Sequence, residues 1–466
     1  MRSPLLFLLL FSAFVWAKGD VYQASEHGIK GDGILVETQA LQKLVDTCAA
    51  EGGGTVILDK GTIVSGMIVL KNGVTLNLAE GVTLKNTGKK EDYPFVSVDI
   101  LTYYPKRRTM IYAQNQQGIA VTGKGTIDGG SSSYKARSSE SDRVSLIRFD
   151  GCQGVEVKDI TLTNASMWTQ HFFCCDNLFV TGIKVKNYMK NDDGLNIDGC
   201  HGVRVDRCDI STHDDAITLK NTGHRESRDV TVSNCKLKSV KSAFKFGTES
   251  YDGFVNVTAR NLTIEGGRDA LAFFSVDGAK IENVLIENIT IIDSKCPLIV
   301  FLGRRLRKIG GDSKQLTIGS VNKMMVKNLK ATGCSKGIIL AGMKGNEVKD
   351  ITLDGVDVHF KPEPPKAAKK KNKKSRKNKK KKSATGDTPT RQADLIVKVQ
   401  ETGYPSSSLF GTLNAWGLFV RHAEGIVLNN VNLTLDGDST AHKAYFEDVR
   451  ALDIPSDLKV QAEIRQ

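Results

Sequence analysis

The sequence predicts an all-β protein, a single-stranded right-handed parallel β-helix (solenoid) with a capping helix at its N-terminal end. The first observation is a repeat: an apolar residue, two others, an apolar residue or Cys, one other, and an apolar residue. It starts at Val157, Val180, Val205 and Val232, so successive starts are 23, 25 and 27 residues apart. It returns at Ile286 and, more weakly, at Val326, Leu353 and Leu428. Such a period indicates a solenoid.

The second observation is that each repeat is a short β-rich run bounded by Gly, Asn and Asp. Such a run cannot bury its apolar side alone, but stacked coils bury a continuous core. The third observation excludes two other architectures. The chain lacks Asn-Gly and Asp-Gly turns at the rhythm that a propeller of hairpins requires. It also leaves no room for the helices of a doubly wound sheet.

In chain order, residues 1–17 are expected to be a secretory signal peptide. Arg2 supplies the positive start, Leu5 to Val15 form the apolar stretch, and Val15-Trp16-Ala17 provides a small-x-small cleavage site. The β-helix domain is then expected to cover residues 18–466. The apolar stretch from Leu5 to Val15 is too short to span a bilayer, and no run of about 18 or more apolar residues occurs elsewhere, so we expect no integral membrane association.

The predicted capping helix lies in the stretch "ETQALQKLVDTCAAEGGG". Leu41, Leu44, Val45 and Cys48 follow the helical period, and Gly52 to Gly54 end the helix. Its expected role is to cover the open N-terminal end of the stack.

A lysine-rich stretch explains most of the formal net charge of +13. Lys366 to Ser383 carries 12 Lys and Arg and no acid, so the rest of the chain has a charge of only +1. We expect a disordered insertion at about residues 360–393. It is either a solvated loop without a specific role or a site of attraction to an acidic polymer. It has no interleaved aromatic pattern, so nucleic-acid binding is not expected.

The nine cysteines do not form a dense disulfide framework. Cys208 and Cys235 occupy matching points of successive repeats, which favours stacked buried thiols. No structural zinc site is predicted, and disulfides are neither predicted nor excluded.

Two acidic pairs, Asp192-Asp193 and Asp214-Asp215, are separated by about one coil. Rungs of parallel strands lie about 4.8 Å apart, so these carboxylates are expected on one shared face. Clustered carboxylates raise at least one pKa, as a general acid requires. Two carboxyl groups about 6.5–9.5 Å apart are typical of an inverting glycoside hydrolase. The alternatives are turn residues or a calcium site.

The stretches "NDDGLNID" and "HDDAITLK" resemble the Asn-x-Asp-Gly and Asp-Asp motifs of glycoside hydrolase family 28, the polygalacturonase family of pectin-degrading enzymes. "VTGKGTIDGG" at Val121 to Gly130 fits another family feature, and the resemblance covers about residues 20 to 360. It implies that Asp214 is the general acid and that Asp193 and Asp215 hold and deprotonate the attacking water. It also implies inversion without a metal or other cofactor.

The resemblance is incomplete where the family binds its substrate. Family polygalacturonases have Gly-His-Gly where this chain reads "SVKSAFKFGTES", and only Arg268 remains as a counterpart of their Arg-Ile-Lys. Lys245 and Glu249 either rebuild a sugar subsite or form a surface pair. Lys220 either reaches toward substrate or is an ordinary strand lysine.

Trp168 and His171 lie one coil before Asp193. Trp168 either stacks on a sugar ring or belongs to the core, and His171 is expected to contact substrate.

We therefore expect a secreted hydrolase, extracellular or periplasmic and monomeric, that cleaves a pectin-like or other acidic polysaccharide. A polysaccharide lyase and a non-catalytic glycan-binding β-helix are the alternatives.

Overall fold

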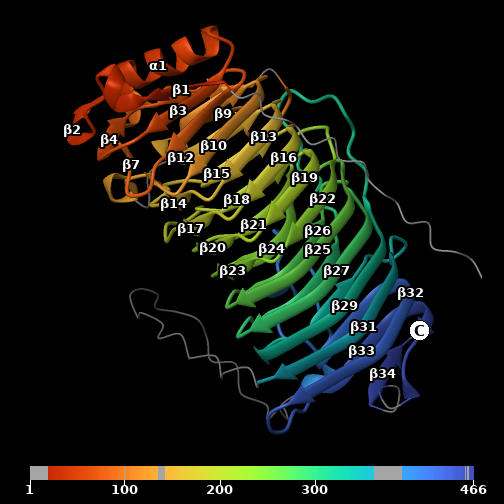
Figure 1. Ribbon diagram of the computed structural model, residues 1–466. Helices are drawn as coiled ribbons and strands as arrows, with labels where there is room; N and C mark the ends of the chain where they lie inside the picture. The colour runs from red at the N-terminus through yellow and green to blue at the C-terminus, as the bar shows by residue number, and fades with distance from the viewer. Residues whose placement is uncertain are drawn as a thin grey trace, which may run out of the picture.

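Strands that pair in parallel with the next coil form the body of the molecule (Figure 1). The computed structural model describes residues 19–98, 100–134, 142–361, 391–456, 458 and 461–465. The fold is the predicted single-stranded right-handed parallel β-helix. The expected signal peptide, residues 1–17, and residues 362–390 of the expected insertion lie outside the described residues.

Three rows of strands run along the stack, and the first row carries the carboxylates discussed below. We call this row the site sheet. It contains β5 (Ile68–Val69), β9 (Lys106–Gln114), β12 (Val144–Asp150), β15 (Gln170–Phe173), β18 (Leu195–Asp198), β21 (Ile217–Asn221), β24 (Ser242–Ser250), β26 (Asp269–Ser275), β28 (Cys296–Leu302), β30 (Ile338–Ala341), the start of β32 (Ala415–Leu435), β33 (His442–Asp453) and β34 (Ala462–Arg465). β8 (Val96–Ser97) pairs with β9 in the antiparallel sense.

The other two rows close each coil. The second row contains β1 (Asp20–Gln23), β3 (Gly54–Leu58), β6 (Val74–Leu78), β10 (Gln117–Gly123), β13 (Gln153–Lys158), β16 (Asp176–Thr181), β19 (His201–Asp206), β22 (Ser227–Ser233), β25 (Gly253–Glu265), β27 (Lys280–Ile292), β29 (Ser320–Cys334) and β31 (Val348–Phe360). The third row contains β2 (Asp32–Val36), β4 (Thr62–Ser65), β7 (Thr83–Asn86), β11 (Thr126–Asp128), β14 (Thr161–Thr163), β17 (Lys184–Lys186), β20 (Asp209–Thr212) and β23 (Lys236–Ser239). From β25 onward single long strands cover both rows.

Asparagine sets the corner between these two rows. Asn234, Asn261, Asn288 and Asn328 have φ values between 53° and 56°, a left-handed conformation that Asn tolerates better than most residues. The side-chain amides of the last three each donate to the preceding asparagine along the stack, at distances of 2.9, 3.2 and 3.1 Å. The repeated corner therefore also satisfies its own side-chain polar groups.

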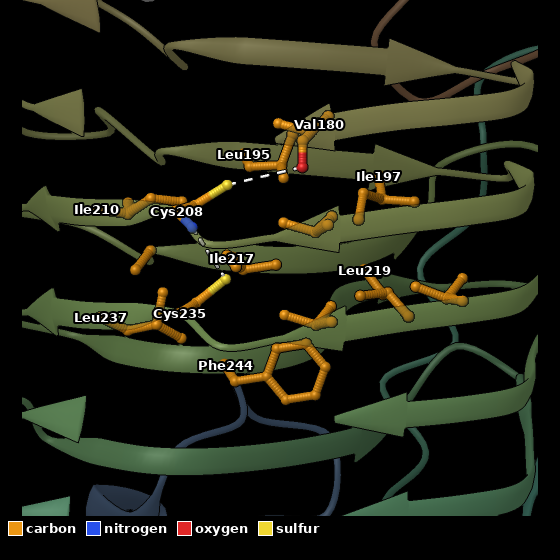
Figure 2. Close-up of a cluster of buried hydrophobic side chains, with 14 of the residues drawn as sticks. Val180, Leu195, Ile197, Cys208, Ile210, Ile217, Leu219, Cys235, Leu237 and Phe244 are labelled. Atoms are coloured by element: carbon orange, nitrogen blue, oxygen red, sulfur yellow. Dashed lines mark hydrogen bonds between the residues drawn. The ribbon is translucent and has the colours of Figure 1, made fainter. Parts of the chain in front are cut away.

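The inward side chains form one continuous apolar core along the stack (Figure 2). The backbone N–H of Cys208 lies 3.4 Å from Cys235 Sγ one coil later, and both thiols are buried. The predicted stacked thiols are confirmed, and all nine cysteines are free thiols.

The predicted capping helix is α1 (Thr38–Ala50), which covers the N-terminal end of the stack (Figure 1). Its buried residues are the four that the sequence pattern picked out: Leu41, Leu44, Val45 and Cys48. Short 3-10 turns occur at η1 (Ala24–His27), η2 (Lys90–Asp92), η3 (Ser131–Ser133), η5 (Gln392–Asp394) and η6 (Ser407–Phe410). No helix among the described residues is long and apolar enough to cross a membrane.

The middle of the site sheet differs from the other rows because both of its faces are buried. Every residue of β15, β18, β21 and β24 is buried, whereas exposed and buried positions interchange along β27. Two segments contact its outer face. We call residues 100–105 the strap and residues 396–414 the plug.

Candidate active site

Three aspartates from two successive coils lie close together, just before the N-terminal ends of two adjacent strands of the site sheet. Asp193 lies just before β18, and Asp214 and Asp215 lie just before β21. One carboxylate oxygen from each residue lies within 4.8 Å of the others. Asp193 and Asp215 are buried, while Asp214 is partly exposed. Residues 21 and 22 positions apart in the sequence thus form one acidic cluster.

Asp192 bends the chain so that both members of the second pair reach the cluster. Its Oδ1 accepts hydrogen bonds from the backbone N–H groups of His213 and Asp214, at 3.1 and 2.7 Å. Its Oδ2 accepts from the N–H of Met189 at 2.9 Å. Burial raises the pKa of Asp192 to about 6, although these hydrogen bonds oppose the shift. Asp192 holds the corner, a role that the sequence analysis missed.

Two buried lysines face the cluster from the outer side of the site sheet. Lys245 Nζ donates to Asp215 Oδ2 at 2.7 Å, and Lys220 Nζ lies 3.7 Å from Asp193 Oδ2. The Lys245 and Lys220 side chains are 1% and 5% exposed. The clustered acids are therefore balanced by two ammonium groups that are also shielded from water.

The three carboxyl groups have opposed pKa shifts. Burial raises the pKa of Asp193 well above its ordinary value, and burial together with the charge of Asp215 raises that of Asp214. Burial would also raise the pKa of Asp215, but the charges of Lys245 and Lys220 hold it below its usual range. The site therefore places carboxyl groups with raised pKa beside one with a lowered pKa, the kind of pairing that acid–base catalysis uses.

Glu249 lies beyond Lys220 and connects β24 to two loops. It accepts hydrogen bonds from Tyr104 Oη at 3.2 Å and Arg307 Nη2 at 2.6 Å, and it lies 3.4 Å from Lys220 Nζ. Burial opposes ionisation, but Lys220, Arg305 and Arg307 lower the pKa of Glu249 to about 2. Glu249 is thus an ionised, buried anchor, and Lys220 bridges it to Asp193.

The Trp168 ring packs against Lys220, and the His171 ring packs against Trp168. Lys220 Nζ is 4.8 Å from the Trp168 ring centroid, and the His171 ring is 5.1 Å from that of Trp168. His171 Nε2 lies 2.9 Å from Asp198 Oδ2, and His171 is only 2% exposed. Trp168 therefore supports Lys220, while His171 lies one contact further from the aspartates.

Arg268 lies on the far side of the cluster, just before β26. Its Nε donates to Asp269 Oδ2 at 2.7 Å, and its side chain is 20% exposed. Its positive charge contributes to the lowered pKa of Asp215. Arg268 is therefore a cationic side chain near the trio that retains access to solvent. Lys241, whose charge acts on Asp214, is also partly exposed.

Among the described residues, Asp193, Asp214 and Asp215 form the one group whose oxygens are arranged to hold a metal ion. Lys245 at 2.7 Å and Lys220 at 3.7 Å already place positive charge against these carboxylates. Their ammonium groups would repel a divalent cation. The donor set therefore fits proton transfer better than metal binding.

The fold and this cluster together define a parallel β-helix protein with an acid–base site on one sheet. The model of the family "Glycosyl hydrolases family 28" matches residues 60–383. The chain belongs to this family.

Known relatives agree with the family assignment at low sequence identity. A probable polygalacturonase of Vitis vinifera is 26% identical over 214 residues, covering 42% of this chain and 43% of that protein. An exo-poly-α-D-galacturonosidase of Dickeya chrysanthemi is 23% identical over 304 residues, covering 52% of this chain and 50% of that protein. The matches thus span about half the length of these relatives. The structure of the family 28 exopolygalacturonase of Yersinia enterocolitica shares the fold, with a TM-score of 0.68, 18% identity, and coverage of 95% of this chain and 79% of that chain.

Proposed function

We propose that this protein is an exported, monomeric hydrolase that cleaves glycosidic bonds of a pectin-like, uronate-rich polysaccharide with inversion. The carrying observation is the trio Asp193, Asp214 and Asp215, whose oxygens lie within 4.8 Å and whose pKa shifts are opposed. The names of the two sequence relatives, a probable polygalacturonase and an exo-poly-α-D-galacturonosidase, support the substrate class.

In the proposed reaction Asp214 protonates the oxygen of the leaving sugar as the bond from that oxygen to the anomeric carbon breaks. Asp214 suits this role because its pKa is raised and its side chain is partly exposed. Asp193 holds a water molecule, and ionised Asp215 takes the proton from that water as its oxygen bonds to the anomeric carbon. One proton is donated and one is accepted. Exchange with solvent then removes the proton from Asp215 and returns one to Asp214, which closes the cycle without a cofactor.

The close spacing of the trio bears on the stereochemistry. Its oxygens lie within 4.8 Å, less than the roughly 6.5–9.5 Å that separates an acid and a base on opposite faces of a sugar. In our proposal Asp193 and Asp215 hold the water between them. The water therefore does not have to fit into a wide gap between the acid, Asp214, and the base. Proton NMR of the first-formed product decides this point. Retention of configuration would make Asp193 or Asp215 a nucleophile and refute inversion.

The cationic residues supply the proposed contacts to a uronate. Lys245 and Lys220 face the trio, and Arg268 lies at its accessible side. We assign Trp168, His171 and Glu249 to holding Lys220 in place, because each contacts Lys220 or a residue that does. In our proposal Lys220 and Lys245, together with the remaining Arg268, supply the positive charge that the absent parts of the Gly-His-Gly and Arg-Ile-Lys motifs do not.

The test is an assay against polygalacturonate and a panel of other acidic polysaccharides. A hydrolase releases reducing ends without an unsaturated, ultraviolet-absorbing product, whereas a lyase releases that product and a binding protein releases neither.

We expect Asp214→Asn to lower kcat by about 10²–10⁴-fold with little change in melting temperature, because proton donation is lost while the backbone contacts of Asp214 remain. The matched control is Asp209→Asn, an exposed aspartate on the neighbouring β20. Full activity of the Asp214→Asn protein would exclude Asp214 as the acid.

A further inference from the structure

The outer face of the site sheet is covered on both sides of the aspartates, which is unusual for a site meant to hold the middle of a long polymer. A chain that passed through would need several uncovered rungs, each about 4.8 Å apart, on either side of the cleaved bond. In this molecule every residue of β15, β18, β21 and β24 is buried, and so is every residue of β26 and β28. What covers these strands determines which substrates can enter.

The strap, residues 100–105, crosses one side. Thr102 forms an antiparallel bridge with Gly223 just after β21, and the Tyr103 N–H donates to the Thr222 carbonyl at 2.7 Å. The Tyr104 ring packs 4.9 Å from that of Trp168, and its hydroxyl donates to Glu249 at 3.2 Å. The strap is therefore fastened across the rungs that carry Trp168, Lys220 and Glu249.

The plug, residues 396–414, closes the other side. Val397, Phe410 and Leu413 join a second apolar cluster on the outer face of β26, β28 and β30, with the Phe410 ring 5.4 Å from that of Phe301. The Ser407 N–H donates to Asp269 at the start of β26, at 3.3 Å. The apolar packing fixes the plug on the rungs that directly follow Lys245.

The tip of the plug reaches the site itself. Lys245 Nζ lies 3.4 Å from Tyr404 Oη, and Tyr404 is 60% exposed. Glu401, also near the tip, pairs with Arg304 at 2.8 Å, which ties the plug to the loop after β28. The exposed or partly exposed groups around the trio include Asp214, Lys241, Arg268 and Tyr404. These four groups mark the entrance.

We propose that this entrance leads to a pocket with a closed end, so that the protein removes units from the end of a polysaccharide chain rather than cutting within it. The plug supplies the end wall, with Tyr404 against the terminal sugar and Lys245 and Arg268 against its charge. This inference rests on the proposed function. It adds the mode of attack, which the acid cluster alone does not determine.

The experiment follows viscosity, reducing ends and product size during cleavage of the best polysaccharide in the panel. We expect one small product from the earliest time points and a viscosity that falls far more slowly than reducing ends accumulate. An early ladder of oligomers with a rapid loss of viscosity would overturn the pocket while leaving the hydrolase assignment intact. Absence of cleavage on every polysaccharide would instead refute the proposed function, and this inference with it.

The second part of the experiment repeats these measurements with a variant in which the end wall is opened. Replacing residues 400–405 by Gly-Gly removes the tip and keeps the apolar contacts of Phe410 and Leu413. We expect the drop in viscosity per bond cleaved to increase at least about fivefold. If the deletion variant does not fold, Tyr404→Ala should change the product pattern in the same direction. The matched control is Tyr188→Ala, because Tyr188 is another exposed tyrosine, with 69% of its surface accessible. An unchanged product pattern in both opened variants would contradict the role of the plug.

Discussion

At the scale of single residues, Lys245 decides which carboxylate is ionised. It is buried and donates to Asp215 at 2.7 Å, and its charge is the main influence that lowers the pKa of Asp215 against the effect of burial. The proposed base is active when ionised, that is, above its own pKa. The acidic limb of the pH–rate profile therefore reports Asp215, and the alkaline limb reports Asp214.

We expect Lys245→Met to move the acidic limb of kcat/KM to higher pH, because Asp215 loses the charge that favours ionisation. Loss of one partner of a buried ion pair should also lower stability by about 3–5 kcal/mol. The measurements are the pH dependence of kcat/KM and a urea unfolding curve. The control is Lys236→Met, an exposed lysine on β23. An acidic limb that stays in place would show that Asp215 is not the base.

The three catalytic candidates could be predicted from sequence because one coil separates the acidic pairs and the rung spacing brings them together. The sequence predicted Asp192 only as a member of an acidic pair. Its hydrogen bonds from the N–H groups of His213 and Asp214 depend on a corner geometry that the sequence does not specify. Lys245 and Asp215 were both candidates, but their contact was not predicted, because the register that places Lys245 beside Thr218 on β21 appears only in the structure.

At the scale of elements, Glu249 fastens the strap and the loop after β28 to β24. Its folded pKa of about 2 lies below the ordinary value of 4.5, so its ionisation stabilises the fold above pH 4.5. That contribution is lost as the pH falls from about 4.5 toward 2. The shift corresponds to about 3 kcal/mol.

Glu249→Gln should therefore lower the urea midpoint at pH 7, with the difference from the unmodified protein shrinking at pH 3. Hydrogen exchange should show faster exchange in residues 100–105 as the strap loosens. The matched control is Glu265→Gln, which removes an exposed ion pair with Lys238 and should change stability much less. An equal loss at both pH values would mean that the side chain acts by packing rather than by charge.

The strap and the plug were not predictable from the repeat. Tyr104 and Glu249 are 145 residues apart, and Lys245 and Tyr404 are 159 apart, and neither contact recurs from coil to coil. A repeat predicts what every coil does, such as burying its apolar residues or placing Asn at a corner. It cannot predict which single loop crosses the sheet. The described chain resumes at Arg391, so part of what the sequence assigned to a disordered insertion borders the plug.

At the scale of the whole molecule, the stack behaves nearly as a one-dimensional array. Each coil contacts its neighbours above and below, so stability is close to a sum of local terms. The helix α1 lies at one end (Figure 1), while the aspartates lie several coils away, before β18 and β21. Damage to the cap should therefore weaken the first coils and leave the site unaffected.

We expect Leu41→Ala, at a fully buried position of α1, to destabilise the N-terminal coils by about 2–5 kcal/mol through lost burial and a residual cavity. Hydrogen exchange should show reduced protection across residues 20–90, while residues 170–250 and kcat stay within about twofold of the unmodified protein. Ile291→Ala, buried in β27 on the other side of the site, is the matched comparison and should loosen a different set of coils. If Leu41→Ala reduced protection evenly along the chain, the molecule would unfold as one cooperative unit. The cap would then protect the site as much as the end of the stack.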